Sequence, residues 1–400
     1  MKSNWKEERL GSLVRFSSGG TPNKNNPDYW NGTIPWISAK NMKSEVIETS
    51  DLSITEEGLI HGSKIAPKGS LLLLVRGSGL FNGIPVCYLE NAVAYNQDVK
   101  CIESTSELEN KYLFYWLKAN SGYLRKKIEF TSIGAGKFDT RFLSNLVVRF
   151  PDIVTRKKII DMADNISDRI NINKKINENL LQQAIALFGE ALNRSVNLSY
   201  TELGALADVK GGKRLPKGVN LITTRNTHPY IRVRDLNNVV FASLSADYEY
   251  VDDETQKSIA RYIVSAGDVL ISIVGTIGLT AIVDKSLDQA NLTENCVKIS
   301  NLKGISPEYL LLYLRSPDGI EKIKKGTVGA VQLKLPIKNI QAIQTPLLSK
   351  EELDSLDNVL KSIFEQISLN VTESKSLAEV RDALLPRLMS GEMDVSCLDF

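Results

Sequence analysis

The amino-acid sequence predicts an α+β protein with two duplicated globular domains, separated by two long helices that pair as an antiparallel coiled coil. Three observations predict this fold. The chain has 400 residues, which is more than a single hydrophobic core usually serves. Its first half is repeated, in degenerate form, in its second half. Two segments, 153–193 and 347–390, lose almost all glycine and space their apolar residues three and four positions apart.

The duplication is visible as short segments that match in pairs and in the same order. LGSL at 10–13 and LGAL at 203–206 are each followed by a Gly-Gly pair, at 19–20 and 211–212. The other pairs are IPWISAKNM (34–42) with HPYIRVRDL (228–236), KIAPKGSLLLLVRGSG (64–79) with YIVSAGDVLISIVGTIG (262–278), DVKCI (98–102) with NCVKI (295–299), and KYLFYWLKAN (111–120) with EYLLLYLRSP (308–317). A Gly-Ala pair, at 134–135 and 329–330, then precedes a proline in each half. We therefore expect two homologous domains.

Short β-branched runs between Gly, Pro and Asn predict the strands of each domain, for example Leu71–Val75, Ile84–Tyr88 and Val269–Val274. One helix in each half, around 108–119 and 306–316, is expected to cover these strands. The resulting boundaries are 1–152 for the first domain, 153–195 for a central helical region, 196–346 for the second domain and 347–400 for a C-terminal helical region.

The two glycine-poor segments show the alternating spacing of a coiled-coil seam. The first seam is predicted to contain Ile159, Ala163, Ile166, Ile170, Asn173, Asn177, Leu180, Ala184 and Leu187, and the second Leu353, Leu356, Leu360, Ile363, Ile367, Asn370, Ser374, Leu377, Arg381, Leu384 and Leu388. Asn173 and Asn370 match one another in the repeat. In an antiparallel pair with a pseudo-two-fold axis we expect them to meet and to set the register. The alternative is two unrelated helices, each packed on its own domain.

Several classes of protein are excluded by what the sequence lacks. The N-terminus MKSNWKEERL has no apolar signal-peptide region, and the apolar run 71–75 is too short to span a membrane, so no membrane association is expected. The four cysteines (87, 101, 296 and 397) and two histidines (61 and 228) form no zinc-binding spacing. We expect reduced cysteines in a cytoplasmic protein and no metal site.

The sequence also predicts no catalytic residue. It contains no GxxxxGK[ST] phosphate loop, no GxSxG elbow, no acid-x-Lys nuclease cluster and no Asn/Asp-Pro-Pro-aromatic tetrad of the amino-methyltransferases. VGTIG at 274–278 is interpreted as a strand–turn–strand rather than a nucleotide fingerprint. We therefore expect that the chain is not an enzyme and holds no cofactor.

Basic residues gather in two turn-rich segments of the second half, although the net charge of the whole chain is only +2. Between 205 and 235 there are seven Lys and Arg against two acidic residues, and between 321 and 338 five Lys against one Glu. Such groups are suited to holding phosphates and reading base edges. Two similar readers joined by a fixed spacer would suit a DNA site with two half-sites. The alternative for each group is an ordinary solvated face.

Several segments in this order carry a resemblance to a known family. They are GGTP, YW and IPWI within 19–37, GGKRLPKG (211–218), YIRVRDL (230–236), GDVLISIVGTIG (267–278), NLTENCVKI (291–299) and RDALLPRLMSGEMD (381–394). Together they resemble the specificity subunit of type I restriction-modification systems over essentially the whole chain. The first helical region departs from the family pattern, because it ends in ALFGEAL rather than in an LLP-type tail.

The resemblance implies that 1–152 and 196–346 are target recognition domains, each reading one half of a split, asymmetric site in double-stranded DNA. The helical regions would fix the gap between the half-sites. Expected partners are two copies of a modification subunit, which carry S-adenosylmethionine and methylate adenine, and a motor-nuclease (restriction) subunit that uses ATP and Mg for cleavage. Because the two domains diverge, the two half-sites should differ.

The segment 19–42 is expected to present DNA-contacting side chains on a loop that its three prolines stiffen and that Trp30 and Trp36 anchor. Trp36 aligns with Tyr230, which makes it a structural position. Ser38 and Lys40 align with Arg232 and Arg234. Each pair is predicted to occupy alternate positions of one strand, so that its side chains share a face. The predicted DNA contacts are Lys24, Asn25, Ser38, Lys40, Asn41, Arg76 and Lys137 in the first domain, and Lys213, Arg214, Arg232, Arg234 and Lys334 in the second.

Two other classes of function stay open at this point. A structural scaffold whose repeated domains bind proteins, organised by the coiled coil, is favoured by the near-neutral net charge. An enzyme with an unfamiliar site is disfavoured by the absent motifs.

Overall fold

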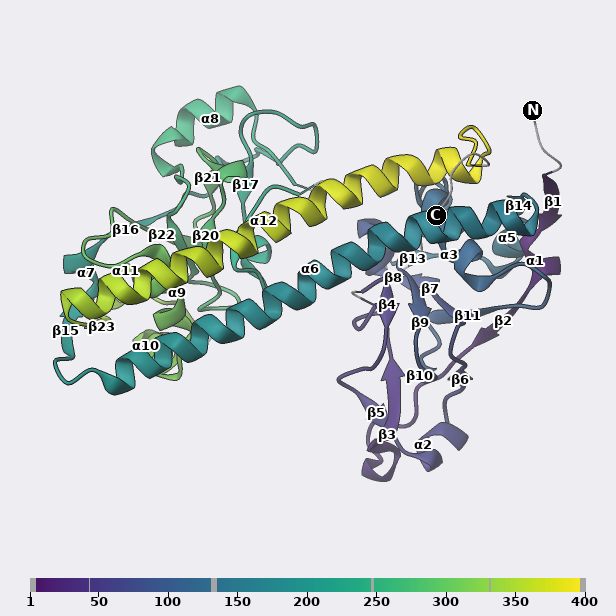
Figure 1. Cartoon of the computed structure of the whole chain (residues 1–400), viewed down its shortest axis with the longest axis horizontal. Coiled ribbons are helices and arrows are strands. Elements are labelled where there is room, and N and C mark those ends of the chain that lie inside the picture. The colour runs from purple at the N-terminus through teal and green to yellow at the C-terminus, as the bar shows by residue number, and fades with distance from the viewer. Residues whose placement is uncertain (1–4, 43, 131–134, 246–247, 331, 396–400) are drawn as a thin grey trace. The chain divides into compact units, whose positions relative to one another are not determined.

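The structure of the protein is a computed structural model that describes residues 5–42, 44–130, 135–245, 248–330 and 332–395. Of the sequence features above, Gly134 and Cys397 lie outside these residues. Backbone contacts divide the chain into two compact units, residues 1–171 with 374–400 (unit 1) and residues 172–373 (unit 2). Each unit combines one globular domain with a part of both long helices (Figure 1).

A five-stranded sheet forms the centre of the domain in unit 1, with the strand order β2-β11-β7-β9-β4. Its central strand β7 consists of four leucines, all of them buried, as expected for a strand covered on both faces. Helix α3 (Asn110–Ala119) packs on this sheet and buries residues 112–117. The strands of this sheet are β2 (Val14–Ser18), β4 (Val46–Ile47), β7 (Leu71–Leu74), β9 (Val86–Leu89) and β11 (Val99–Ser104).

Three smaller sheets complete the described part of this domain. The four-stranded sheet β5-β3-β10-β6 carries the predicted DNA-contacting segment 19–42, which includes β3 and the residues on both sides of it. The strands of the smaller sheets are β1 (Lys6–Arg9), β3 (Trp30–Ile37), β5 (Ser53–Ile54), β6 (Ile65–Ala66), β8 (Arg76–Gly77), β10 (Val93–Tyr95), β12 (Glu129–Phe130), β13 (Gly136–Lys137) and β14 (Val147–Phe150). The short helices are α1 (Leu10–Leu13), α2 (Glu56–Ile60), α4 (Ser121–Arg125) and α5 (Thr140–Ser144).

The domain in unit 2 repeats this topology. Its five-stranded sheet has the order β16-β22-β19-β20-β18, and in both domains the last strand of that order is parallel to its neighbour while the other pairs are antiparallel. The strands are β15 (Ser199–Glu202), β16 (Asp208–Gly211), β17 (Tyr230–Ile231), β18 (Phe241–Ala242), β19 (Val269–Ser272), β20 (Thr280–Val283), β21 (Asn291–Leu292), β22 (Cys296–Ser300) and β23 (Gln344–Leu347). The helices are α7 (Leu203–Leu206), α8 (Asp253–Ile259), α9 (Pro307–Arg315), α10 (Pro317–Gly326) and α11 (Ile337–Gln341).

The predicted α+β fold and its duplication are confirmed. The strands expected at 71–75, 84–88 and 269–274 are found as β7, β9 and β19, and the covering helices as α3 and α9. The stretch 274–278 joins β19 to β20, as its interpretation as a strand–turn–strand required.

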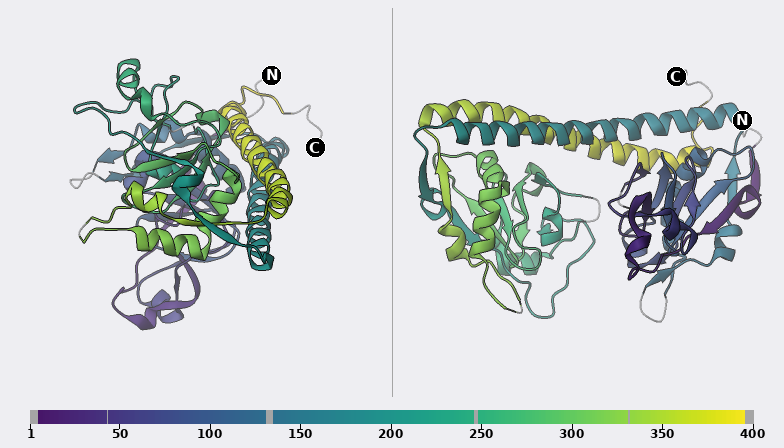
Figure 2. Two further views of the ribbon diagram at one scale, coloured as in Figure 1. Left: turned by 90° about the vertical axis from the view of Figure 1, so that its left-hand side faces the viewer. Right: turned by 90° about the horizontal axis from the view of Figure 1, so that it is seen from below.

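The two glycine-poor segments form the long helices α6 (Ile153–Arg194) and α12 (Lys350–Met389). Within each unit their described parts lie side by side (Figures 1 and 2). In unit 2, Ser195, just after the end of α6, donates to Glu352 near the start of α12, and Asn370 donates to Asn177. In unit 1, Arg381 donates to Ser167. In unit 2 the contact residue number falls along α6 (195, 177) as it rises along α12 (352, 370), so the two helices pair antiparallel. The alternative of two unrelated helices, each packed only on its own domain, is therefore excluded.

The seam agrees with the prediction at most positions and differs at one end. Leu353, Leu356 and Leu360 are buried, as are Ile159 and Ala163. At the end of α6, however, Leu187 is 37% exposed and the neighbouring Phe188 is only 3% exposed. Phe188 packs its ring edge-on against Tyr309 of α9, with 4.9 Å between ring centroids. At this end of α6 the globular domain, through Tyr309, provides the packing partner of the helix. Phe188 is therefore buried there in place of Leu187, the residue that the heptad spacing predicted.

The predicted meeting of Asn173 with Asn370 is wrong in its partners. The Nδ2 atom of Asn370 donates to Oδ1 of Asn177 at 2.8 Å, and Nδ2 of Asn173 donates to Oε2 of Glu373 at 2.7 Å. The antiparallel alignment sets Asn370 one helical turn further along α6 than the sequence repeat suggested. Asn370 is 5% exposed, so its amide needs a partner inside the seam, and Asn177 supplies it.

Arg156 attaches the start of α6 to the domain of unit 1. Its side chain is 2% exposed, its Nε donates to Glu109 Oε2 at 2.8 Å, and its terminal nitrogens donate to the carbonyl oxygens of Pro151 and Glu107 at 3.0 and 3.1 Å. The planar guanidinium thus donates hydrogen bonds to three acceptors in three directions. An apolar side chain could not replace these bonds.

Replacing Arg156 should destabilise unit 1. We expect Arg156→Met to lower the free energy of unfolding by about 3 kcal/mol, because it leaves a carboxylate and two carbonyls without their buried donor. Arg156→Lys should not restore it, since an ammonium cannot span three directions. Urea titration of the full chain measures the effect, with the exposed Lys157→Ala as control. A loss below 1 kcal/mol for Arg156→Met would contradict this role.

The Asn177–Asn370 pair should behave as a coupled unit. Asn370→Leu and Asn177→Leu are each expected to cost about 1–3 kcal/mol, because each leaves the other amide in the seam without its partner, whereas the double variant Asn177→Leu/Asn370→Leu should regain most of that stability. A double-mutant cycle from urea titrations checks this, with the exposed Asn179→Ala as the neutral control. Additive losses in the double variant would show that the two side chains are not coupled.

Candidate nucleic-acid interface

Two tryptophans hold the loop that precedes β3 in unit 1. Their rings meet edge to face with centroids 5.2 Å apart. The Trp36 Nε1 donates to Gly20 O and the Trp30 Nε1 to Asn23 O, each at 3.1 Å. Trp36 is 3% exposed. The prediction that these indoles anchor the loop, and that Trp36 is structural, is confirmed.

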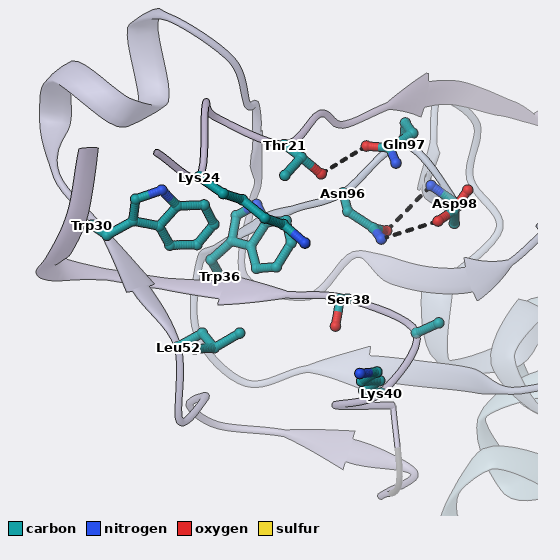
Figure 3. Close-up of a pocket in the computed structure, with 11 residues that line it drawn as sticks. Thr21, Lys24, Trp30, Trp36, Ser38, Lys40, Leu52, Asn96, Gln97 and Asp98 are labelled. Carbon is teal, nitrogen blue, oxygen red and sulfur yellow. Dashed lines mark hydrogen bonds between the residues drawn. The ribbon is translucent and has the colours of Figure 1, made fainter. Parts of the chain in front are cut away.

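A hollow of about 530 Å³ opens beside this loop (Figure 3). Three of the predicted contact residues, Lys24, Ser38 and Lys40, line it together with the two tryptophans. Its remaining lining residues are Thr21, Ala39, Leu52, Asn96, Gln97 and Asp98. Asn25 lies on the same loop and is exposed, with its backbone N–H donating to Asn23 Oδ1. The hollow therefore combines ammonium groups, amides, a carboxylate and an indole face.

The residues after β3 lie in a turn, so the prediction of one continuing strand is wrong. β3 ends at Ile37. The Asn41 Oδ1 atom accepts from both the backbone N–H and the hydroxyl of Ser38, at 3.2 and 2.7 Å, and the Asn41 N–H donates to Ser38 O at 3.0 Å. These bonds close the chain on itself. Ser38 and Lys40 therefore reach the hollow from a turn, and Asn41 holds that turn.

The same turn follows β17 in unit 2 and corrects the same prediction for Arg232 and Arg234. The Arg232 N–H donates to Asp235 Oδ2 at 2.7 Å, and Asp235 N–H to Arg232 O at 2.9 Å, so the chain enters a 3-10 helix, Val233–Leu236. Both arginines form ion pairs with Glu249. Burial lowers the pKa of Arg232, and the neighbouring Arg234 acts in the same direction. Burial also raises the pKa of Asp235.

Two predicted residues of the first domain face each other on paired strands. Arg76 in β8 lies opposite Lys137 in β13, and both side chains are exposed. The Arg76 N–H donates to the carbonyl of Asp98, which lines the hollow. In unit 2, Lys334 forms a β-bridge with Val274, the position that corresponds to Arg76. The sequence match of Lys137 with Lys334 is thus a structural match.

A second hollow, of about 340 Å³, lies in unit 2 and contains Arg214 and Lys334. Its other lining residues are Val274, Glu294, Asn295 and Gln332. Arg214 Nε donates to Glu294 Oε1 at 2.7 Å. Burial is the largest single influence on Glu294 and opposes its charge, but the hydrogen bonds from Arg214, Thr293 and the backbone, together with the charge of Arg214, outweigh burial, so the pKa of Glu294 lies below its usual value. Lys213 is exposed next to the hollow, with its Nζ 5.5 Å from the centroid of the Tyr262 ring.

Sequence reasoning missed two short loops, one of which lines the hollow in unit 1 and the other the hollow in unit 2. They are residues 96–98, between β10 and β11, and 293–295, between β21 and β22. All three residues of the first loop and two of the second line a hollow, and the residues at matching positions are Gln97 with Glu294 and Asp98 with Asn295. The signal was present, because DVKCI and NCVKI were aligned, but only their apolar residues were interpreted.

No metal-binding cluster of three or more His, Cys, Asp or Glu side chains occurs among the residues that the structure describes. Cys87, Cys101 and Cys296 are buried free thiols. Burial raises the pKa of Cys87 and of Cys296 to about 12. In the described part of the chain, no helix is long and apolar enough to cross a membrane.

Known proteins resemble either a part of this chain or nearly all of it. The chain is 29% identical over 169 residues to the EcoR124I/EcoR124II type I restriction enzyme specificity subunit of Escherichia coli, a match that covers 42% of this chain and 41% of that protein. It is 22% identical to the MjaIX specificity subunit of Methanocaldococcus jannaschii, over 98% of this chain and 94% of the relative. The crystal structure of the type I restriction-modification S subunit from M. genitalium has the same fold, with a TM-score of 0.50, 17% identity and coverage of 97% and 96%.

A family model described as the type I restriction modification DNA specificity domain matches twice, at residues 2–182 and 196–378. The two matches repeat the duplication that the sheets display. The expectation of a specificity subunit with DNA-recognition domains, rather than an enzyme, agrees with the family. Because the two matches together span most of its residues, the chain belongs to the type I restriction modification DNA specificity family.

Proposed function

We propose that the two domains, 1–152 and 196–346, each read one half of a bipartite, asymmetric DNA site, and that this reading directs adenine methylation and cleavage by partner subunits. The helical regions 153–195 and 347–400 set the gap between the half-sites. Two copies of a methyltransferase subunit, which carry S-adenosylmethionine, and a restriction subunit that uses ATP and Mg are the partners in this proposal. The complex works in the cytoplasm.

One observation carries the proposal above all others: the same backbone frame recurs in both domains with different side chains at its rim. In unit 1 the hollow presents Lys24, Lys40 and Gln97, and in unit 2 Arg214 and Lys334. Positively charged groups suit phosphates, and the amides and guanidinium suit base edges. A shared frame with divergent tips fits two readers of unlike half-sites.

The decisive test maps methylated adenines genome-wide in cells with and without this chain, with its partner methyltransferase held constant. We expect a split motif that is methylated only when the chain is present, with a fixed gap between two unlike halves. If the complex assembles and the methylation pattern does not change, the chain does not select DNA sequence, and the scaffold function takes its place.

Salt dependence separates phosphate contacts from protein docking. DNA affinity of the assembled complex should fall steeply with salt, and Lys24→Ala or Lys137→Ala should each reduce the slope of log affinity against log salt by about one. Both variants should weaken all DNA sequences alike. The control is Lys6→Ala, because Lys6, which lies on β1, forms an ion pair with Glu107. A shallow slope that neither variant changes would indicate that these lysines do not meet the backbone.

A further inference from the structure

The two hollows share one side-chain contact at matching positions of the fold. In unit 1, the Thr21 hydroxyl donates to Gln97 Oε1 at 2.8 Å (Figure 3). In unit 2, Arg214 Nε donates to Glu294 Oε1 at 2.7 Å. In unit 1 the contact joins the segment after β2 to the loop before its neighbour β11. In unit 2 it joins the segment after β16 to the loop before its neighbour β22.

Backbone hydrogen bonds show that these positions are equivalent. Gly20 N–H donates to Tyr95 O, and Lys213 N–H donates to Leu292 O, at 2.9 and 2.8 Å. The carbonyls of the same two residues, Gly20 and Lys213, accept from the Trp36 indole and the Tyr230 hydroxyl. The next residues along the chain are therefore Thr21 in one domain and Arg214 in the other. The structure thus aligns Gly19 with Gly212, one residue away from the alignment of the Gly-Gly pairs in the sequence.

The loops that carry Gln97 and Glu294 are fixed by matching backbone bonds. Asn96 N–H donates to Ile37 O at 2.9 Å, and Thr293 N–H to Ile231 O at 3.0 Å. On the other side of Gln97 and Glu294, the carbonyl of Asp98 accepts from the Val75 N–H, and the carbonyl of Asn295 accepts from the Ile273 N–H. The loop backbone is held on both sides, so only its side chains can differ in what they recognise.

The Arg214–Glu294 pair has the chemistry of a guanine reader. Arg214 is 81% exposed, while Glu294 is 29% exposed and also accepts from the Thr293 hydroxyl at 3.1 Å. The carboxylate therefore takes the Nε–H and restrains the guanidinium plane, and the two terminal nitrogens of this exposed side chain are left as a donor pair. Guanine is the base whose major-groove edge offers two adjacent acceptors, N7 and O6, to such a pair.

We propose that Arg214, oriented by Glu294, reads a guanine in the half-site of the second domain, and that the Thr21–Gln97 pair occupies the same reading position in the first domain. Glu294 acts through Arg214 and is a positioning residue. The neutral Gln97 amide offers one donor and one acceptor, which match adenine rather than guanine. The two half-sites then differ at this position. This inference rests on the proposed reading of a bipartite site.

The test is methylome mapping with variants of the full chain in its assembled complex. Arg214→Ala should relax one G·C position in one half-site, with a roughly 10- to 100-fold loss of discrimination there and no change in the other half-site or in the gap. Glu294→Leu should relax the same position, whereas Glu294→Gln should retain the preference because its amide oxygen still accepts from Nε. Gln97→Ala should relax a position in the other half-site.

Matched controls keep the outcomes distinct. Arg225→Ala removes an exposed arginine from the same loop and should leave the motif unchanged. If Arg214→Ala lowers methylation at an unaltered motif, Arg214 meets the phosphate backbone and the inference is wrong. It is equally wrong if Glu294→Leu keeps the guanine or if the relaxed position is not a G·C pair. A pattern that never depends on the chain would instead remove the proposed function itself.

Discussion

The candidate interface of each domain depends on one short parallel strand pair. Strand β3 pairs with β10 in unit 1, and β17 pairs with β21 in unit 2, each over only two residues. Parallel neighbours end at the same edge, so the turn after one strand and the loop after the other emerge together. Ser38 and Asn96, or Arg232 and Thr293, are thereby brought side by side although they lie some sixty residues apart in the chain. This edge places the loops 96–98 and 293–295, which contribute to the lining of the two hollows.

The anchoring residues of the pair differ in chemistry and agree in effect. Trp36 and Tyr230 occupy the same position, each 3% exposed, and each donates one hydrogen bond to the backbone of the incoming chain. A buried aromatic ring with a polar tip supplies both packing area and a directed bond. The frame can therefore persist while the exposed residues around it change, which separates the requirement for folding from the requirement for recognition.

Much of the fold could be predicted from the sequence, because its strongest signals are periodic. Apolar runs predicted β7, β9 and β19, and the 3–4 spacing of apolar residues predicted α6 and α12. The internal sequence repeat predicted the two similar domains. Pattern reasoning failed where a single side chain decides the geometry. Asn41 and Asp235 turn the chain after its strand, which ended the expected alternation at Ser38 and Arg232. Gln97 and Glu294 sit in loops of three residues, too short for any period, and only the packing of distant strands identifies them.

The composition of unit 1 has a consequence for synthesis. This unit joins the first 171 residues to the segment from 374 onward, where Leu385 and Leu388 enter the same core as Leu10 and Val148. Unit 2 is a single uninterrupted stretch. All residues of unit 2 have been translated by residue 373, whereas the core of unit 1 also includes Leu385 and Leu388 in the last turns of α12. The unit that begins first in the sequence is therefore completed last, and a chain that stops between residues 374 and 384 would contain all of unit 2 but lack the contribution of Leu385 and Leu388 to the core of unit 1.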